Sequence, residues 1–240
     1  MIKPVKRLNV TDSIVNQIKE LVLQGKLNQG DKLPPERELI TLFKVGRPSL
    51  REALKVLEAQ GLIEKSQKGM IITGNHDKFF TDSLMFQLYF SSVDWNDIFE
   101  TRRFMERELT FMATKRATID DFNEIDQTIS DMELAIHSNN QKEYVSANLH
   151  FHDKIAKTSK NLVMYNLYQS INNLVEHSQV QAVVVPGIMN DSLQYHKDIL
   201  YAMKDRNTEL ASELMVNHIN SVQRHLLIKT NKKGVRPPVQ

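Results

Sequence analysis

The stretch that decides the fold of the first part of the chain is residues 34–57, PPERELITLFKVGRPSLREALKVL. Its two prolines fix a non-helical entry, and the apolar residues that follow predict a short helix within PERELITLF, residues 35–43. A second helix is predicted from Pro48 to Leu57, because leucines recur there at three- and four-residue intervals. Residues 44–46, Lys-Val-Gly, are expected to form a tight turn between the two helices. Two short helices joined by such a turn predict a helix-turn-helix motif.

A further helix and a hairpin are predicted on either side of this motif. Upstream, apolar residues from Val10 to Leu23 follow a helical period, with Thr11 or Asp12 as a candidate cap. Downstream, LIEK at 62–65 and MIIT at 70–73 predict two strands joined by a basic tip. The order helix, helix, helix, hairpin predicts a winged helix-turn-helix domain at 1–74, followed by a linker at 75–80.

The overall composition is that of an ordinary globular chain, with 240 residues, 41% apolar and 25% charged. The absence of cysteine excludes disulfides, thiolate metal sites and a cysteine nucleophile. No run reaches the roughly 20 apolar residues of a membrane-spanning helix, and the first residues lack the apolar block of a signal peptide. We therefore expect a cytoplasmic protein without a membrane partner.

The charge is divided unevenly along the chain. Residues 1–76 carry 13 Lys and Arg against 8 Asp and Glu, a net of +5, whereas the remainder carries 18 against 21, a net of −3. A basic first part indicates a polyanionic partner. Arg47 and Arg51 lie in the first turn of the predicted third helix, the end that enters the major groove and where arginines can bond guanine edges.

Residues 33–69, LPPERELITLFKVGRPSLREALKVLEAQGLIEKSQKG, resemble the winged helix of the GntR family of bacterial transcription regulators. The likeness covers residues 10–73, and Pro35 departs from the serine that is commoner at that position. The resemblance implies a homodimer that binds an inverted-repeat operator in double-stranded DNA, through Arg37, Arg47, Arg51, Lys68 and Gly69. Ser49, in the same helical turn as the two arginines, completes the set of DNA-binding candidates.

The rest of the chain is predicted to be helical. Its apolar periodicity predicts helices at 97–117, 119–138, 141–158, 161–185, 189–204 and 207–229. The apolar stripe of the helix at 119–138 is expected to consist of Phe122, Ile125, Ile129, Met132 and Leu134. These helices predict an antiparallel bundle of six to seven helices over 81–229, with a disordered tail at 230–240. The expected fold class is mainly α, a winged helix-turn-helix followed by an all-α bundle.

Polar residues on the apolar faces of these helices are the candidates for a ligand site, since bundles build such sites from facing helices. Five residues lie in such places: Arg102, Asn148, His152, His196 and His218. A single histidine of this kind is more often a satisfied core residue than a ligand. Together the five indicate a site, because buried polar groups are costly unless they pair or bind metal. The other histidines are expected to be surface or structural residues: His76, His137, His150, His177 and His225.

The same spacing resembles the effector domain of the FadR-type branch of this family, the FCD domain. In that domain a D-x-x-x-H pair and two later histidines hold a divalent metal inside a helical bundle. Here Asn148 and His152 form the pair, His196 follows after 44 residues and His218 after a further 22. The early E-x-R-x-x-x-E signature of the domain also occurs, as Glu100, Arg102 and Glu106. The likeness extends over residues 80–228.

The FCD resemblance implies a divalent metal ion held by Asn148, His152, His196 and His218. Zn²⁺ is the first choice and Ni²⁺ or Mn²⁺ are the alternatives. The resemblance also implies that Arg102 binds an effector. Asn148 stands where the family usually has aspartate. Because an amide oxygen brings no charge, we expect weaker metal binding and a stronger attraction of the bound dication for an anion. In the alternative without metal, the histidines and Arg102 bind the effector directly.

The predicted function is that of a transcriptional regulator that is switched by a small organic acid. We expect a repressor rather than an activator, and we do not expect an enzyme. A metal-dependent hydrolase is one rival, since three histidines with an open position can activate water. Against it, no inward carboxylate near the histidines is evident, with Glu106 as the one candidate. A metal-free regulator of the same family that senses an acyl ligand, with Met105 and Met112 lining the pocket, is the second rival. An architectural DNA-binding protein is the third, and it leaves the inward polar residues unexplained.

Overall fold

The computed structural model describes residues 9–67, 69–73 and 94–231. The chain divides into two compact units, residues 1–83 and residues 84–240. The predicted linker at 75–80 and residues 232–240 of the predicted tail lie outside the described residues, so both remain predictions.

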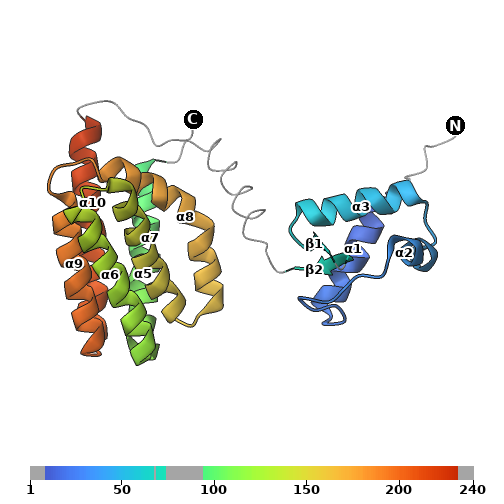
Figure 1. Cartoon of the computed structure of the whole chain (residues 1–240), viewed down its shortest axis with the longest axis horizontal. Helices are drawn as coiled ribbons and strands as arrows, with labels where there is room; N and C mark the ends of the chain where they lie inside the picture. The colour runs from blue at the N-terminus through green and yellow to red at the C-terminus, as the bar shows by residue number, and fades with distance from the viewer. Residues whose placement is uncertain (1–8, 68, 74–93, 232–240) are drawn as a thin grey trace, which may run out of the picture. The chain divides into compact units, whose positions relative to one another are not determined.

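The first unit is a winged helix-turn-helix, as predicted (Figure 1). Its elements follow in the order α1 (Val10–Leu23), α2 (Glu36–Phe43), α3 (Arg47–Ala59), β1 (Ile63–Ser66) and β2 (Gly69–Ile72). The two strands pair in antiparallel fashion, with Ile63 opposite Ile72 and Ser66 opposite Gly69. Each strand is displaced by one residue from its predicted position.

The start of α1 and the turn between α2 and α3 differ in detail from the sequence prediction. The N-cap of α1 is Asn9, whose side chain accepts a hydrogen bond from the backbone N–H of Thr11, so neither Thr11 nor Asp12 is the cap. Asparagine is a preferred cap because its short side chain reaches the free N–H groups of the first turn. The turn between α2 and α3 places Lys44, with φ 52°, in the left-handed region, while Gly46 is extended.

The core of the first unit draws on all three helices and both strands. Its buried side chains include Ile14, Ile18, Leu39, Leu50, Leu54, Leu57, Ile63 and Ile72. The leucines of α3 face this core, as the three- and four-residue spacing predicted. The N-terminal arginines of α3 therefore remain on the outer surface.

The second unit is a bundle in which the described residues form six helices (Figure 1). They are α5 (Trp95–Arg116), α6 (Ile119–His137), α7 (Gln141–Thr158), α8 (Leu162–Ala182), α9 (Ile188–Lys204) and α10 (Thr208–Asn231). Helix α5 packs against α10 and α7, α6 packs against α7 and α9, and α8 covers α7 and α5. Among the described helices none is long and apolar enough to cross a membrane.

The helix ends and one core position correct the sequence prediction. Helix α8 ends at Ala182 rather than at residue 185, and Pro186, which lacks an N–H, cannot donate a helical hydrogen bond to the carbonyl oxygen of Ala182. Helix α10 continues to Asn231, so the first two residues of the predicted tail are helical. Leu134 was expected on the apolar stripe of α6 but is 66% exposed, whereas Met132 and Ala135 are buried.

Candidate functional site

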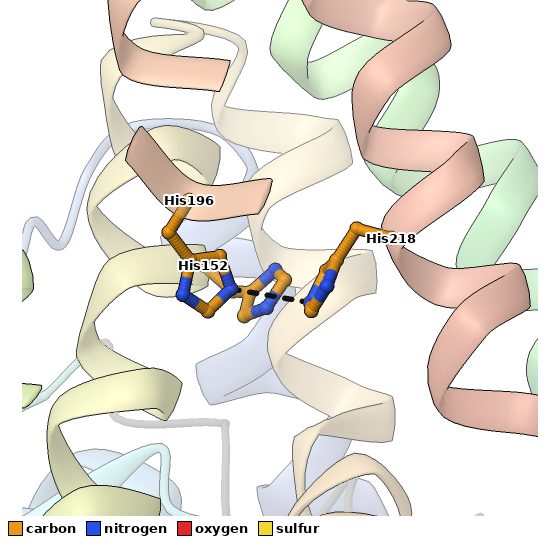
Figure 2. A group of neighbouring side chains, drawn as sticks. All are labelled: His152, His196 and His218. Carbon is orange, nitrogen blue, oxygen red and sulfur yellow. Dashed lines mark hydrogen bonds between the residues drawn. The ribbon is translucent and has the colours of Figure 1, made fainter. Parts of the chain in front are cut away.

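Three buried histidines from three helices converge in the bundle (Figure 2). His152 lies on α7, His196 on α9 and His218 on α10, and each is at most 2% exposed. One ring nitrogen of each lies within 4.8 Å of the others, and Nε2 of His196 is 3.1 Å from Nε2 of His218. The helical spacing thus brings together the three histidines that the sequence singled out.

The geometry and protonation of this cluster fit a divalent metal. Two nitrogen ligands at about 2.0–2.1 Å from one zinc ion lie about 2.8–3.4 Å apart at octahedral or tetrahedral angles. The 3.1 Å separation of His196 and His218 falls in that interval. Burial lowers the pKa of both rings well below its usual value, and nearby positive charges lower it further. Both rings are therefore neutral near pH 7, the state that metal binding requires.

A buried carboxylate joins the histidine cluster to Arg102 on α5. Glu106 accepts a hydrogen bond at Oε1 from Nε of Arg102 at 2.8 Å, and its Oε2 lies 2.6 Å from Nδ1 of His152. Arg102 is 1% exposed and Glu106 is 3% exposed. Burial alone would raise the pKa of Glu106, but Arg102 and His152 lower it to about 2. Glu106 is therefore a buried anion between two side chains of the site.

Glu106, the one candidate for an inward carboxylate near the histidines, does lie beside them. The signal was present in the sequence, because Glu106 follows Arg102 by four residues and therefore shares its helix face. A carboxylate at Nδ1 of a histidine commonly orients the ring so that Nε2 is free for a metal. Nε2 of His152 has no hydrogen-bond partner among the described residues.

The buried polar atoms that lack a hydrogen-bond partner within the described part of the chain include three more that bear on this site. They are Oδ1 of Asn148, Nη1 of Arg102 and the hydroxyl of Tyr168 on α8. Asn148 is 7% exposed and lies one turn before His152, where an amide oxygen ligand is expected. Tyr168 was missed by sequence reasoning, because a tyrosine on an apolar stripe reads as an ordinary core residue.

The remaining histidines and Glu100 lie apart from this cluster where the structure describes them. His137, His150 and Glu100 are exposed. Nδ1 of His225 is 2.8 Å from the carbonyl oxygen of Ser221. His76 and the side chain of His177 lie outside the described residues.

The predicted DNA-binding residues that the structure describes lie on the surface of the first unit. Arg37 on α2 and Arg47 and Arg51 on α3 are exposed, Ser49 is half-buried and Gly69 is exposed. Nε of Arg51 lies 3.0 Å from Oε2 of Glu36, an ion pair between α3 and the start of α2. Gly69 follows the hairpin tip with φ 113°, a conformation that favours glycine. Lys68, at that tip, is outside the described residues.

Residues 10–72 match the bacterial regulatory proteins of the gntR family, and residues 97–221 match the FCD domain. The chain belongs to the GntR family. It is a GntR-family regulator with a C-terminal FCD domain.

Relatives and a solved structure agree with this assignment. The chain is 28% identical to the HTH-type transcriptional regulator YcbG of Bacillus subtilis (strain 168), over 95% of both chains. It is 25% identical to the HTH-type transcriptional repressor NanR of Klebsiella aerogenes, over 92% of this chain and 86% of the repressor. The structure of Streptococcus agalactiae GntR superposes with a TM-score of 0.68 at 27% identity, over 89% of this chain and 99% of the other.

These findings establish a DNA-binding transcriptional regulator rather than an enzyme, since the family and the relatives are transcriptional regulators. The structure gives a separate reason against the hydrolase alternative. Both carboxylate oxygens of Glu106 are occupied, one by Nε of Arg102 and the other by Nδ1 of His152, and its pKa of about 2 makes it a poor proton acceptor.

Proposed function

We propose that this GntR-family regulator is a cytoplasmic homodimeric repressor that releases an inverted-repeat operator when a small organic acid binds inside the FCD domain. The observation that carries the proposal is the convergence of three buried histidines with the Arg102–Glu106 pair. The similarity to NanR, a repressor, supports the sign of the response.

The proposed metal site consists of His152, His196 and His218, with the amide oxygen of Asn148 as a fourth ligand. Zinc is the first choice because it accepts histidine nitrogen and oxygen ligands, and Ni²⁺ and Mn²⁺ are the alternatives. When bound, the dication would supply a positive centre that attracts a carboxylate. Asn148 brings no negative charge, so the metal is held less tightly than it would be by an aspartate.

The charge balance of the site favours an anionic effector. The charges of Arg102 and Glu106 cancel each other, Asn148 carries no charge, and burial keeps His196 and His218 uncharged. A dication in this site therefore keeps its charge in a buried region, where uncompensated charge is costly. An acid that enters as its carboxylate compensates part of that charge.

Arg102 is oriented to receive such a carboxylate. Glu106 engages its Nε, while its Nη1 has no hydrogen-bond partner among the described residues. Guanidinium groups bind carboxylates through parallel N–H bonds, which adds directional specificity to the charge attraction. Arg102 is thus the proposed effector-binding residue, and Glu106 holds its side chain in place.

The proposed operator contacts come from the surface of the winged helix. Arg47, Ser49 and Arg51 at the start of α3 would read the major groove, and Arg37 on α2 would assist them. Lys68 and Gly69 of the hairpin would contact the phosphate backbone of the DNA beside that groove. The acid would change the relative placement of the two winged helices in the dimer. It can shift DNA affinity only as far as its own affinity differs between the two placements, and such coupling free energies are typically about 1–3 kcal/mol.

The proposal is tested first on protein purified without a histidine tag. Its metal content is measured, and thermal melts are compared with and without chelator and with glycolate, L-lactate and pyruvate. We expect about one divalent metal per chain, a lower melting temperature after chelation and a higher one with at least one acid. Absence of metal together with an unchanged melt after addition of Zn²⁺, Ni²⁺ or Mn²⁺ would reject the metal site.

A further inference from the structure

Tyr168 on α8 is a fully buried tyrosine whose hydroxyl has no hydrogen-bond partner within the described residues. Its side chain belongs to a small apolar cluster with Met105 and Leu109 of α5 and Ala156 of α7. Met105 directly precedes Glu106, and Ala156 lies one turn after His152. The ring of Tyr168 therefore packs against the two helices that carry Arg102, Glu106 and His152.

The charged side chains of the site act on the hydroxyl of Tyr168. Burial raises the pKa of Tyr168 well above its usual value, the negative charge of Glu106 raises it further, and Arg102 lowers it. The hydroxyl therefore stays protonated at any pH at which the protein works. A neutral hydroxyl can donate one hydrogen bond and accept others.

A phenylalanine at this position would fill the same apolar space without burying an unpaired polar group. Burying a hydroxyl without a partner costs stability, so the tyrosine weakens the ligand-free protein relative to phenylalanine. Tyr165, one turn earlier on α8, provides a contrast. Its hydroxyl donates to Oδ1 of Asp153 at 3.1 Å and accepts from Nε2 of Gln169 at 2.7 Å. Tyr165 thus contributes to the packing of α8 on α7, whereas the hydroxyl of Tyr168 serves no such contact.

We infer that Tyr168 is a specificity-determining residue of the effector site, and that its hydroxyl bonds an oxygen substituent carried by the acid besides its carboxylate. The inference rests on the proposed function, in which Arg102 and the metal receive the carboxylate. Tyr168 then selects a hydroxy or oxo acid over the unsubstituted acid of the same length. Sites that hydrogen-bond a ligand oxygen discriminate against analogues lacking it, because the site's own polar group is left unpaired.

The test compares three three-carbon acids, L-lactate, pyruvate and propionate, on the full-length metal-loaded protein. Affinities are measured by isothermal titration calorimetry for the unchanged protein, Tyr168→Phe and the control Tyr165→Phe. The unchanged protein is expected to bind lactate or pyruvate about tenfold more tightly than propionate, the range of one buried hydrogen bond. Tyr168→Phe should remove that preference and leave propionate binding unchanged.

The melting temperature of the ligand-free variants supplies a second readout. Tyr168→Phe should melt at the same or a higher temperature than the unchanged protein, because it removes an unpaired buried hydroxyl. Tyr165→Phe should melt at a lower temperature and keep the preference among the acids. Loss of lactate or of pyruvate binding in Tyr168→Phe identifies the bonded oxygen as a hydroxyl or a carbonyl, and both results support the inference.

Two results would overturn the role of Tyr168 while the proposed function stands. One is an unchanged preference in Tyr168→Phe. The other is a lower melting temperature with an equal loss of affinity for all three acids, which indicates a structural tyrosine. If the unchanged protein binds none of the acids, the proposed function fails and the inference fails with it.

Discussion

Oε2 of Glu106 lies 2.6 Å from Nδ1 of His152, while Oε1 of the same carboxylate accepts a hydrogen bond from Nε of Arg102. One buried carboxylate therefore orients both a proposed metal ligand and the proposed effector-binding residue. If the metal and the acid bind as proposed, Glu106 links the two binding events. This relationship leads to the first prediction.

Glu106→Gln should weaken metal binding about 10- to 100-fold. This is the usual effect of removing a carboxylate that holds the other ring nitrogen of a metal-binding histidine. A glutamine has one acceptor oxygen, so it cannot serve both Arg102 and His152. Competition with a chromophoric chelator measures the affinity. Glu100→Gln, at an exposed position of the same helix, is the control and should leave the affinity unchanged. Equal affinities in the two variants would show that Glu106 does not position His152.

Asn148→Asp should strengthen metal binding and weaken acid binding at the same time. The added carboxylate brings a negative charge to the ligand set and reduces the attraction of the site for an anion. Metal competition and calorimetric titration with L-lactate measure the two effects on the same preparation. Affinities that move in the same direction, or that both stay constant, would place Asn148 outside the site.

Arg102→Lys should weaken acid binding by at least tenfold while operator affinity in the absence of acid stays nearly constant. Lysine keeps a positive charge beside Glu106, so the variant avoids the unpaired buried carboxylate that alanine would leave. Arg103→Lys is a matched control, because Arg103 instead bonds Oε1 of Gln223 at 2.6 Å. Acid binding that is unchanged in Arg102→Lys would assign Arg102 a structural role.

Arg47→Ala and Arg51→Ala should each weaken specific DNA binding by about 1–3 kcal/mol. Fluorescence anisotropy at several salt concentrations measures the effect, with exposed Lys26 as the alanine control. Lys68→Ala should also flatten the salt dependence, since a phosphate contact releases counterions. Unchanged affinity in both arginine variants would reject α3 as the DNA-reading helix.

The metal-free protein should lose stability as the pH falls from 7.5 to 5.5. Because the folded-state pKa values of His196 and His218 lie well below the usual 6.5, the unfolded chain takes up more protons in this interval. Each histidine then lowers the unfolding free energy by up to about 1.4 kcal/mol per pH unit below 6.5. The contribution of Glu106 is lost only below its unfolded value of 4.5, outside this range. Urea unfolding of the chelated protein measures the slope, and constant or rising stability on acidification contradicts the buried neutral pair.

Periodic patterns predicted most of the fold, because the buried side chains of each helix recur on one face. The leucines of α3 and the histidines at 152, 196 and 218 were located in this way, and all of them are buried. Leu134 was misplaced because it lies two residues after Met132, on the other side of the helix, where an apolar residue is tolerated at the surface.

Contacts between helices could not be read from periodicity. The spacing of Arg102 and Glu106 places both on one face, but it does not show that Glu106 reaches His152 on α7. The unpaired hydroxyl of Tyr168 likewise depends on which side chains of α5 and α7 lie opposite α8. Sequence patterns indicate which residues point inward, and packing determines which of them meet.

The most direct test measures operator release by an acid with and without metal. A fragment selected from random DNA by the purified protein is titrated to saturation, and glycolate, L-lactate and pyruvate are then added to metal-loaded and chelated protein while anisotropy is followed. We predict that at least one acid releases DNA from the metal-loaded protein, and that chelation or Arg102→Lys removes the response. Release that is equally strong in the chelated protein and in the Arg102→Lys variant would contradict an effector site built from the three histidines, the metal and Arg102.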